Sequence, residues 1–374
     1  MKRTDNLKSI RKIDLSDMAS LLSDFPQQCE EGVKIGQDYK LSSSLKNFTP
    51  SVILFSGLGG SAITGDLIAD LVREEVKFPI LTNRDYTIPN FVNEKTLVFV
   101  ISYSGNTEET LSSYQEVLKR KAKIIVISSG GKLTELARSN KILPLGIPGG
   151  FPPRTALGFL FFSAFTLLQK LNLIKDRGKE TKETFSSLSK LKEELSPDRP
   201  FERNQAKKIA EKLKGKIPII YASNRLSAVA MRFQTQLAEN SKQFSSRNLF
   251  PEMNHNEIMG WNNPISSLKK FLVVFLKDAG DFPRVKSRMK ITQSLIADYP
   301  AGILELNTRG ESVLSRNFSL LYLCDWISFY LAICNQIDPT PVERITLLKK
   351  KLKNLTPSPP SSTLGERKLG EGEL

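Results

Sequence analysis

Histidine is the scarcest residue of this chain, which has a single one, His255, among its 374 residues. A lone histidine cannot build a metal site rich in imidazole ligands. It also excludes a Ser-His-Asp triad unless His255 takes part in it, and the sequence contains no nucleophile elbow. His255 lies in the polar run 252–257, which is typical of a loop, so both a functional and a structural role stay open for it.

Cysteine is also sparse, and long apolar runs are missing. Cys29, Cys324 and Cys334 show no spacing typical of a metal or redox motif, which favours a reducing compartment. The longest apolar stretch, residues 157–168, is too short to span a bilayer and suits a buried helix. The basic N-terminus is not followed by an apolar run. We therefore expect no signal peptide, no membrane association and a cytoplasmic location.

Acidic residues are outnumbered, 39 against 54 basic ones, which gives a net charge of +15. This excess indicates an anionic partner, either nucleic acid or a phosphorylated metabolite. The sequence has no zinc-finger spacing, no aromatic RNA-binding signature and no basic arm. Its one tight basic cluster, Lys349–Lys351, suits a solvated helix face. The pattern favours the phosphorylated metabolite, and we expect no nucleic acid partner.

Short apolar runs alternate with helical patterns along most of the chain, which predicts α/β domains with mostly parallel sheets covered by helices on both faces. Strands are predicted at residues 51–56, 79–83, 96–102, 123–128, 218–223, 271–276 and 302–306. Helices are predicted at residues 61–72, 106–119, 225–240 and 312–337.

The composition divides this pattern into segments. The charged stretch 174–200 contains no strand and indicates an exposed helix between two domains. The tail after residue 355 is rich in Pro, Ser and Gly, which predicts disorder. The predicted segments are a helical lead-in (1–40), a first domain (41–172), a connector (173–200), a second domain (201–337), a C-terminal helix (338–355) and the tail (356–374).

The first predicted strand runs into a glycine-rich turn, Gly57–Ala62. In such a turn, Gly60 allows the backbone to approach a ligand, and Ser61 offers a hydroxyl beside the free N–H groups of a helix N-terminus. The turn also matches the dinucleotide fingerprint G-x-G-x-x-A. That fingerprint expects an acidic residue at the end of the second strand, whereas Asp85 lies beyond it. An ordinary capped turn is the third alternative.

The third predicted strand ends in a cluster of hydroxyl groups. Ser102, Ser104 and Thr107 surround Gly105 at a second strand-to-helix turn. A dinucleotide has no need of such a cluster, whereas a terminal phosphate can accept several neutral hydrogen bonds. Ligands of parallel sheets bind beyond the carboxyl ends of the strands, so both turns should line one crevice. The cluster favours a phosphate site over a simple helix cap.

These two segments, GLGGSAITGDL and SYSGNTEETL, resemble the sugar isomerase (SIS) domain. Residues 40 to 352 together resemble the bifunctional phosphoglucose/phosphomannose isomerases. The resemblance implies two flavodoxin-like αβα sandwiches of the SIS type. It also implies that the sugar phosphate is held by Gly60, Ser61, Ser102, Ser104 and Thr107.

Interconversion of an aldose and a ketose needs a base near C1 and C2, a cation for the developing oxyanion, and groups that open the sugar ring. Arg154 ends the rigid loop Gly149–Arg154, and its Pro-Arg pair matches the family motif, which implies that it stabilises the enediolate. A salt bridge to a local carboxylate is the alternative. Glu239 begins the run Glu-Asn-Ser-Lys, in which the family carries its proton-shuttling base.

The resemblance also assigns ring opening. It implies that His255 performs it from across a homodimer interface, together with a lysine of the last helix. Lys349 fits the family spacing best, although the neighbouring lysines leave the register open. Some members have a threonine where Val342 would align, which leaves sugar discrimination open.

We therefore expect a metal-independent enzyme without a cofactor that converts glucose 6-phosphate, and mannose 6-phosphate, to fructose 6-phosphate. The lone histidine argues against the metal-dependent class of mannose phosphate isomerase. The alternatives are a non-catalytic SIS module that binds phosphosugars and a nicotinamide-dependent oxidoreductase.

Overall fold

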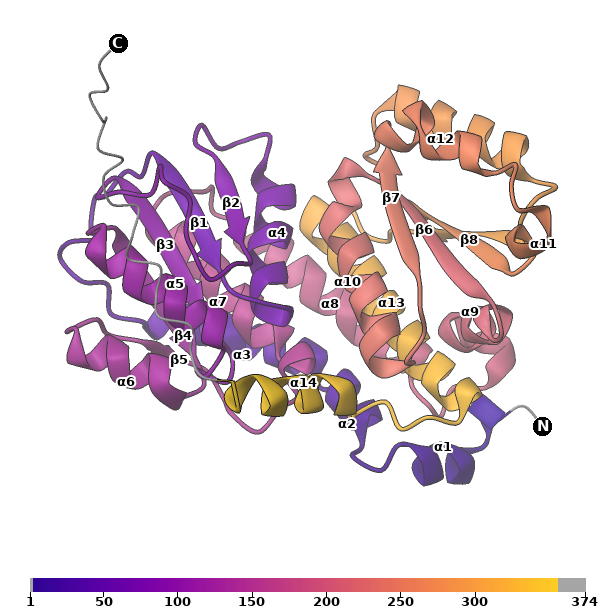
Figure 1. Ribbon diagram of the computed structural model, residues 1–374, viewed down its shortest axis with the longest axis horizontal. Coiled ribbons are helices and arrows are strands. Elements are labelled where there is room, and N and C mark those ends of the chain that lie inside the picture. The colour runs from indigo at the N-terminus through magenta and orange to yellow at the C-terminus, as the bar shows by residue number, and fades with distance from the viewer. Residues whose placement is uncertain (1–2, 356–374) are drawn as a thin grey trace, which may run out of the picture. The chain divides into compact units, whose positions relative to one another are not determined.

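The computed structural model describes residues 3–355 (Figure 1). It divides into one compact unit, Met1–Thr340, and a second unit, Pro341–Leu374, whose described part contains helix α14 (Glu343–Lys353). The tail predicted to be disordered, 356–374, lies outside the described residues. The predicted lead-in is helical and consists of α1 (Leu7–Ile13), α2 (Met18–Ser23) and α3 (Phe25–Asp38).

The first domain contains a parallel sheet in the order β2-β1-β3-β4-β5, the flavodoxin-like order that the SIS resemblance implies. Its strands are β1 (Val52–Ser56), β2 (Ile80–Asn83), β3 (Thr96–Ile101), β4 (Lys123–Ser128) and β5 (Leu145–Gly146). Four of these strands were predicted; the short β5 was not.

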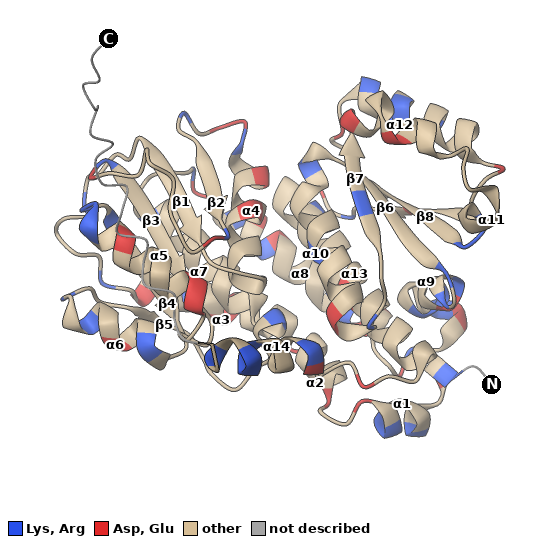
Figure 2. Cartoon of the chain, viewed as in Figure 1, with Lys and Arg blue, Asp and Glu red and all other residues tan. Residues whose placement is uncertain are grey.

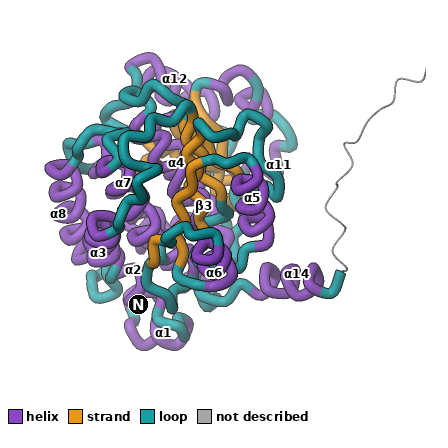
Figure 3. The backbone as a smooth tube through the Cα atoms, turned by 90° about the vertical axis from the view of Figure 1, so that its left-hand side faces the viewer, coloured by secondary structure: helices purple, strands orange, loops and turns teal. Residues whose placement is uncertain are grey.

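Helices cover both faces of this sheet, which explains why its strands are continuous apolar runs. Alternate residues such as Ile53 and Phe55 pack against α3, α4 (Gly60–Val72) and α7 (Leu157–Lys170). Their neighbour Leu54 faces the opposite side, with α5 (Glu108–Lys119) and α6 (Gly131–Ser139). Figure 3 shows α5 on one side of β3 and α3 and α7 on the other.

The second domain repeats this order with four parallel strands, β7-β6-β8-β9. They are β6 (Ile217–Ser223), β7 (Ser246–Phe250), β8 (Phe271–Lys277) and β9 (Gly302–Asn307). One face packs against α9 (Gln205–Leu213), α10 (Ser227–Asn240) and α13 (Val313–Asn335), and the other against α11 (Ile265–Leu268) and α12 (Pro283–Ile296). β7 was not predicted, because an edge strand with the sequence SRNLF is half-exposed and carries little apolar signal.

The two domains share one hydrophobic core, formed by the inner faces of both sheets and the helices between them. At its centre lies α13, which is long and apolar enough to cross a membrane by length and composition alone. Its whole apolar window is buried in the structure, as in the core helix of a soluble protein. The predicted connector forms α8 (Gly178–Leu195), which packs along α13. Lys and Arg residues are spread over several elements, including α1, α6 and α12 (Figure 2).

Candidate active site

Two strand-to-helix turns lie side by side at the carboxyl edge of the first sheet, because β1 and β3 are neighbours. The first turn leads into α4 at Gly60 and the second into α5 at Glu108. Asn6, Asn204 and Ser312 cap α1, α9 and α13, whereas among the described residues no side chain caps α4 or α5. Apart from the N–H of Ser61, which donates to the backbone oxygen of Leu58 at 3.1 Å, the first backbone N–H groups of both helices therefore stay available to an anion at this edge.

The hydroxyl groups predicted to hold phosphate lie on these two turns. The Oγ of Ser102 and the Oγ1 of Thr107 are 2.9 Å apart. The Oγ of Ser61 accepts a hydrogen bond from the backbone N–H of Tyr103 at 3.3 Å, so the first turn contacts the second directly. Ser61 and Ser102 are buried, while Ser104 is exposed. The structure thus brings the predicted hydroxyl cluster together.

Two glycines allow this close approach. Gly105 has a φ of +68°, and a Cβ there would lie 1.8 Å from the backbone oxygen of Gly130. A Cβ on Gly60 would lie 3.0 Å from the backbone oxygen of Pro153, the residue before Arg154. The first turn, Gly57–Ala62, and the loop Gly149–Arg154, here called the arginine loop, are therefore packed against each other without room for a side chain.

Arg154 lies in the short 3-10 helix η2 (Pro153–Thr155), and its side chain is buried. Its Nε donates to the Oδ1 of Asn240 at 2.6 Å, and its Nη2 donates to the backbone oxygens of Pro339 and Thr340 at 2.7 and 2.8 Å. Burial lowers the pKa of Arg154, and the nearby carboxylate of Glu239 opposes that shift. Three fixed acceptors thus hold the guanidinium in one orientation.

Glu239 lies at the end of α10 and meets this guanidinium, with its Oε2 3.6 Å from the Nη1 of Arg154. Its side chain is 30% exposed, against 5% for Arg154. The anion that an arginine in this position needs is therefore a carboxylate from the other domain. The structure joins the predicted base and the predicted oxyanion-binding group in one place.

The remaining residues of the Glu-Asn-Ser-Lys run hold Glu239 in position. Asn240 donates to the Oγ of Ser328 at 2.9 Å, and Ser241 donates to the backbone oxygen of Ser328 at 2.6 Å. The Nζ of Lys242 donates to the backbone oxygen of Glu239 at 2.7 Å. The motif therefore anchors the end of α10 to α13 and places both Glu239 and the Oδ1 of Asn240 beside Arg154.

Sequence reasoning missed a buried ion pair beneath Arg154. Arg232 of α10 donates to both carboxylate oxygens of Asp325 in α13, and its Nη2 donates at 3.0 Å to the backbone oxygen of Arg154. Burial raises the pKa of Asp325, and Arg232 opposes that shift. The available signal was an acidic residue in the middle of an otherwise apolar helix. A charge there needs a buried partner.

His255 lies away from this pair. Within one chain, α10 runs from the carboxyl edge of the second sheet back to its amino edge and places Glu239 there. His255 is exposed in the 3-10 helix η5 (Glu252–His255), beyond the carboxyl end of β7, a strand about 16 Å long at 3.3 Å per residue. Lys349 is exposed in α14, within the second unit.

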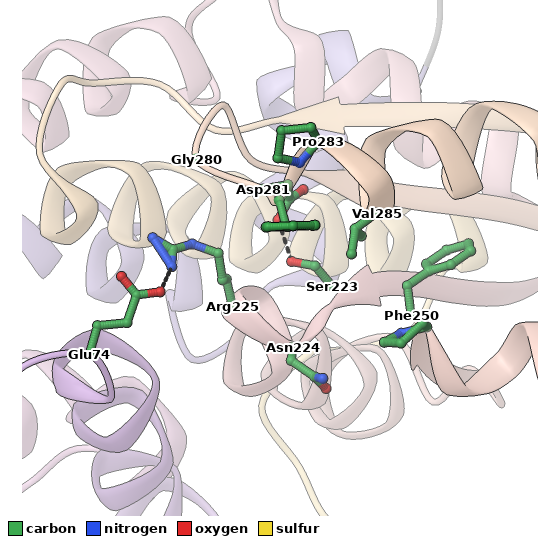
Figure 4. Close-up of a pocket in the computed structure, with 11 residues that line it drawn as sticks. Glu74, Ser223, Asn224, Arg225, Phe250, Gly280, Asp281, Pro283 and Val285 are labelled. Atoms are coloured by element: carbon green, nitrogen blue, oxygen red, sulfur yellow. Dashed lines mark hydrogen bonds and ion pairs between the residues drawn. The ribbon is translucent and has the colours of Figure 1, made fainter.

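The second sheet has a crevice of its own beyond its carboxyl edge, with a volume of about 380 Å³ (Figure 4). Ser223 there donates to the carboxylate of Asp281, and Arg225 pairs with Glu74. A buried carboxylate stands where the first sheet has hydroxyl groups, which makes this crevice unsuited to a phosphate. Among the described residues, no group of three or more His, Cys, Asp or Glu side chains could hold a metal ion.

Comparisons with known proteins match both halves of the chain. Residues 50–143 match the SIS domain model, and residues 202–352 match the model of the bacterial phospho-glucose isomerase C-terminal SIS domain. The bifunctional phosphoglucose/phosphomannose isomerase of Caldicellulosiruptor bescii is 43% identical over 88% of this chain and 97% of its own length. The protein of the same name from Aquifex aeolicus is 38% identical over 82% of this chain and 92% of its own length.

A solved structure shows the same fold. A glucose-6-phosphate isomerase-like protein from Thermus thermophilus aligns with a TM-score of 0.61 and 16% identity, over 92% of this chain and 100% of that one. The two-domain SIS architecture expected from the sequence is therefore confirmed.

Proposed function

We propose that this chain interconverts glucose 6-phosphate and mannose 6-phosphate with fructose 6-phosphate. The chain belongs to the family of the bifunctional phosphoglucose/phosphomannose isomerases and is therefore an isomerase. The observation that carries this proposal is the 3.6 Å pair of Arg154 and Glu239 beside the hydroxyl-lined turns. The reaction needs a phosphate-binding site, a cation that stabilises the enediolate and a carboxylate that acts as the base.

The phosphoryl group would bind at the carboxyl edge of the first sheet. Ser61, Ser102, Ser104 and Thr107 offer hydroxyl groups there, and the N-termini of α4 and α5 offer backbone N–H groups. Neutral donors and two helix dipoles can hold a dianion without a lysine. The missing side chain of Gly60 lets the loop that ends in Arg154 lie against this turn.

Glu239 would carry the proton between C1 and C2, because its carboxylate is partly exposed and faces the site. Arg154 would stabilise the negative charge on the enediolate oxygen, since its guanidinium is buried and held in advance by three acceptors. One base can return the proton to either face of C2 if the enediolate rotates about C2–C3. The same residues can therefore serve both epimeric aldoses.

Ring opening would use His255 of a second copy of the chain and Lys349. Within one chain, Glu239 and His255 lie at opposite edges of the second sheet. A histidine there can reach the glutamate site only if a partner subunit supplies it, which supports a homodimer. We propose that this dimer works in the cytoplasm, without a metal ion or an organic cofactor.

A coupled assay of the purified protein tests the proposal. Both hexose 6-phosphates should be converted to fructose 6-phosphate, and a chelator should leave the rate unchanged. Binding of fructose 6-phosphate without conversion would instead favour a non-catalytic phosphosugar-binding module. A melting shift caused by a nicotinamide nucleotide would favour an oxidoreductase.

A further inference from the structure

Tyr103 lies between two hydroxyl residues of the second strand-to-helix turn, Ser102 and Ser104, yet its own hydroxyl points into the protein. The residue is only 5% exposed. Its Oη donates to the backbone oxygen of Pro148 at 3.0 Å and accepts from the backbone N–H of Phe151 at 2.9 Å. Burial raises the pKa of Tyr103, so the phenol keeps the proton that it donates.

These two hydrogen bonds join the residues on either side of the most flexible part of the arginine loop. The residues between Pro148 and Phe151 are Gly149 and Gly150, where the backbone has the greatest freedom. Three of the seven residues in the segment 148–154 are prolines, which have no N–H of their own to hold the loop. The phenol hydroxyl thus bridges the glycine pair and fixes the loop that ends in Arg154.

The backbone of Tyr103 holds the other half of the site. Its N–H donates to the Oγ of Ser61 in the first phosphate turn, at 3.3 Å. Its backbone oxygen accepts from both the N–H and the Oγ of Ser129, at 3.0 and 2.6 Å. A single residue therefore joins both phosphate turns to the arginine loop.

We infer that Tyr103 is a positioning residue for the isomerisation: through its hydroxyl it sets the place of Arg154 relative to the bound phosphate. The inference rests on the proposed function, since it takes Arg154 as the group that stabilises the enediolate. Tyr103 touches no reacting atom and acts only through the loop. Removing its hydroxyl should therefore impair the chemical step more than the binding of the phosphate.

The variant Tyr103→Phe removes only the oxygen. We expect kcat to fall about tenfold to a hundredfold, because a misplacement of about 1 Å can have an effect of that size. The inhibition constant of glucitol 6-phosphate, which carries the phosphate but lacks a carbonyl, should stay within about twofold of the wild-type value.

Tyr39→Phe is the matched control, because Tyr39 is also buried and its hydroxyl donates to one backbone oxygen, that of Leu143, at 2.7 Å. It should keep the wild-type kcat. Equal loss of kcat in both variants would overturn the inference, and so would a wild-type kcat in Tyr103→Phe.

Two further variants separate positioning from folding. Gly149→Ala stiffens the loop without strain, since its Cβ would make an ordinary contact of 3.9 Å with the Cβ of Ser129. Added to Tyr103→Phe it should restore part of the lost kcat, and it keeps the assay possible if the single variant melts early. Failure of this stiffened variant to exceed Tyr103→Phe in kcat would contradict a role through the loop.

The kinetics of the wild-type protein and of Arg154→Lys together distinguish failure of this inference from failure of the proposed function. If Tyr103 acts through Arg154, its replacement should add little to the loss already caused by Arg154→Lys. Absence of hexose 6-phosphate conversion by the wild-type protein would refute the proposed function itself, and full activity of Arg154→Lys would refute the role of Arg154 on which the inference rests. A low activity of Arg154→Lys beside a normal Tyr103→Phe would refute the role of Tyr103 alone.

Discussion

The Nη1 of Arg154 and the Oε2 of Glu239 lie 3.6 Å apart, across the boundary between two SIS domains. Arg154 comes from the carboxyl edge of the first sheet and Glu239 from the amino edge of the second. The separation is longer than that of a charge-assisted hydrogen bond, which is about 2.7–2.9 Å. The arginine is held mainly by its other acceptors, so a substrate oxyanion can approach it without breaking a tight ion pair.

Replacing Arg154 by lysine should lower kcat about a hundredfold to a thousandfold, the usual effect of losing one preorganised oxyanion donor. A lysine cannot reproduce the planar set of N–H groups that donates hydrogen bonds to Asn240, Pro339 and Thr340. Steady-state kinetics with glucose 6-phosphate measure the effect. Arg177→Lys, which alters an ion pair with Glu75 remote from the turns, should keep its activity. A similar loss in both variants would count against a catalytic role.

Gly60→Ala should impair the enzyme because the added methyl group would press on the backbone oxygen of Pro153 at 3.0 Å. The displaced loop carries Arg154, so kcat should fall, and KM should rise because the turn is also proposed to bind phosphate. Gly146→Ala is the control, since within the described structure its Cβ would meet no atom within 4 Å. The prediction fails if the two alanine variants have equal kcat/KM.

Asp325→Asn should destabilise the fold by about 3–5 kcal/mol, because it leaves Arg232 as a buried charge without its anionic partner. Urea unfolding measures this difference. The exposed pair of Lys277 and Glu305 offers a comparison, and Glu305→Gln should change stability by about 1 kcal/mol or less. Equal effects of the two variants would show that the buried pair is not a structural support of the site.

Asp70 gives the fold a pH dependence. Its carboxylate accepts from the backbone N–H of Ala228 at the start of α10, and burial raises its pKa from 3.8 to about 7. Between these two values the folded state binds a proton that the unfolded state has lost. This group therefore reduces stability as the pH rises from about 4 to about 7, and has no further effect above that.

Asp70→Asn removes the titration and keeps an oxygen for Ala228. The stability difference between variant and wild type, followed by denaturant unfolding at several pH values, should grow in favour of the variant across that range. A difference that does not change with pH would contradict the account.

The sequence predicted most of the apolar strands, because buried parallel strands leave strong local patterns, and it predicted the neighbouring strand-to-helix turns, because glycine and hydroxyl residues mark them. It missed β7, whose edge position leaves it half-exposed and polar. It also missed Tyr103, Arg232 and Asp325, which act through contacts between segments that are distant in the chain. Only the fold could show that the carboxylate beside Arg154 is Glu239.

The most direct test of the account follows the proton that Glu239 is proposed to carry. In deuterated water, the wild-type enzyme should exchange the C1 or C2 proton of the hexose phosphates with solvent, as seen by proton NMR. Glu239→Gln should lower that exchange about a hundredfold to ten-thousandfold while still binding fructose 6-phosphate, because only the base is lost. Exchange at the wild-type rate by Glu239→Gln would contradict the central claim that this glutamate moves the proton.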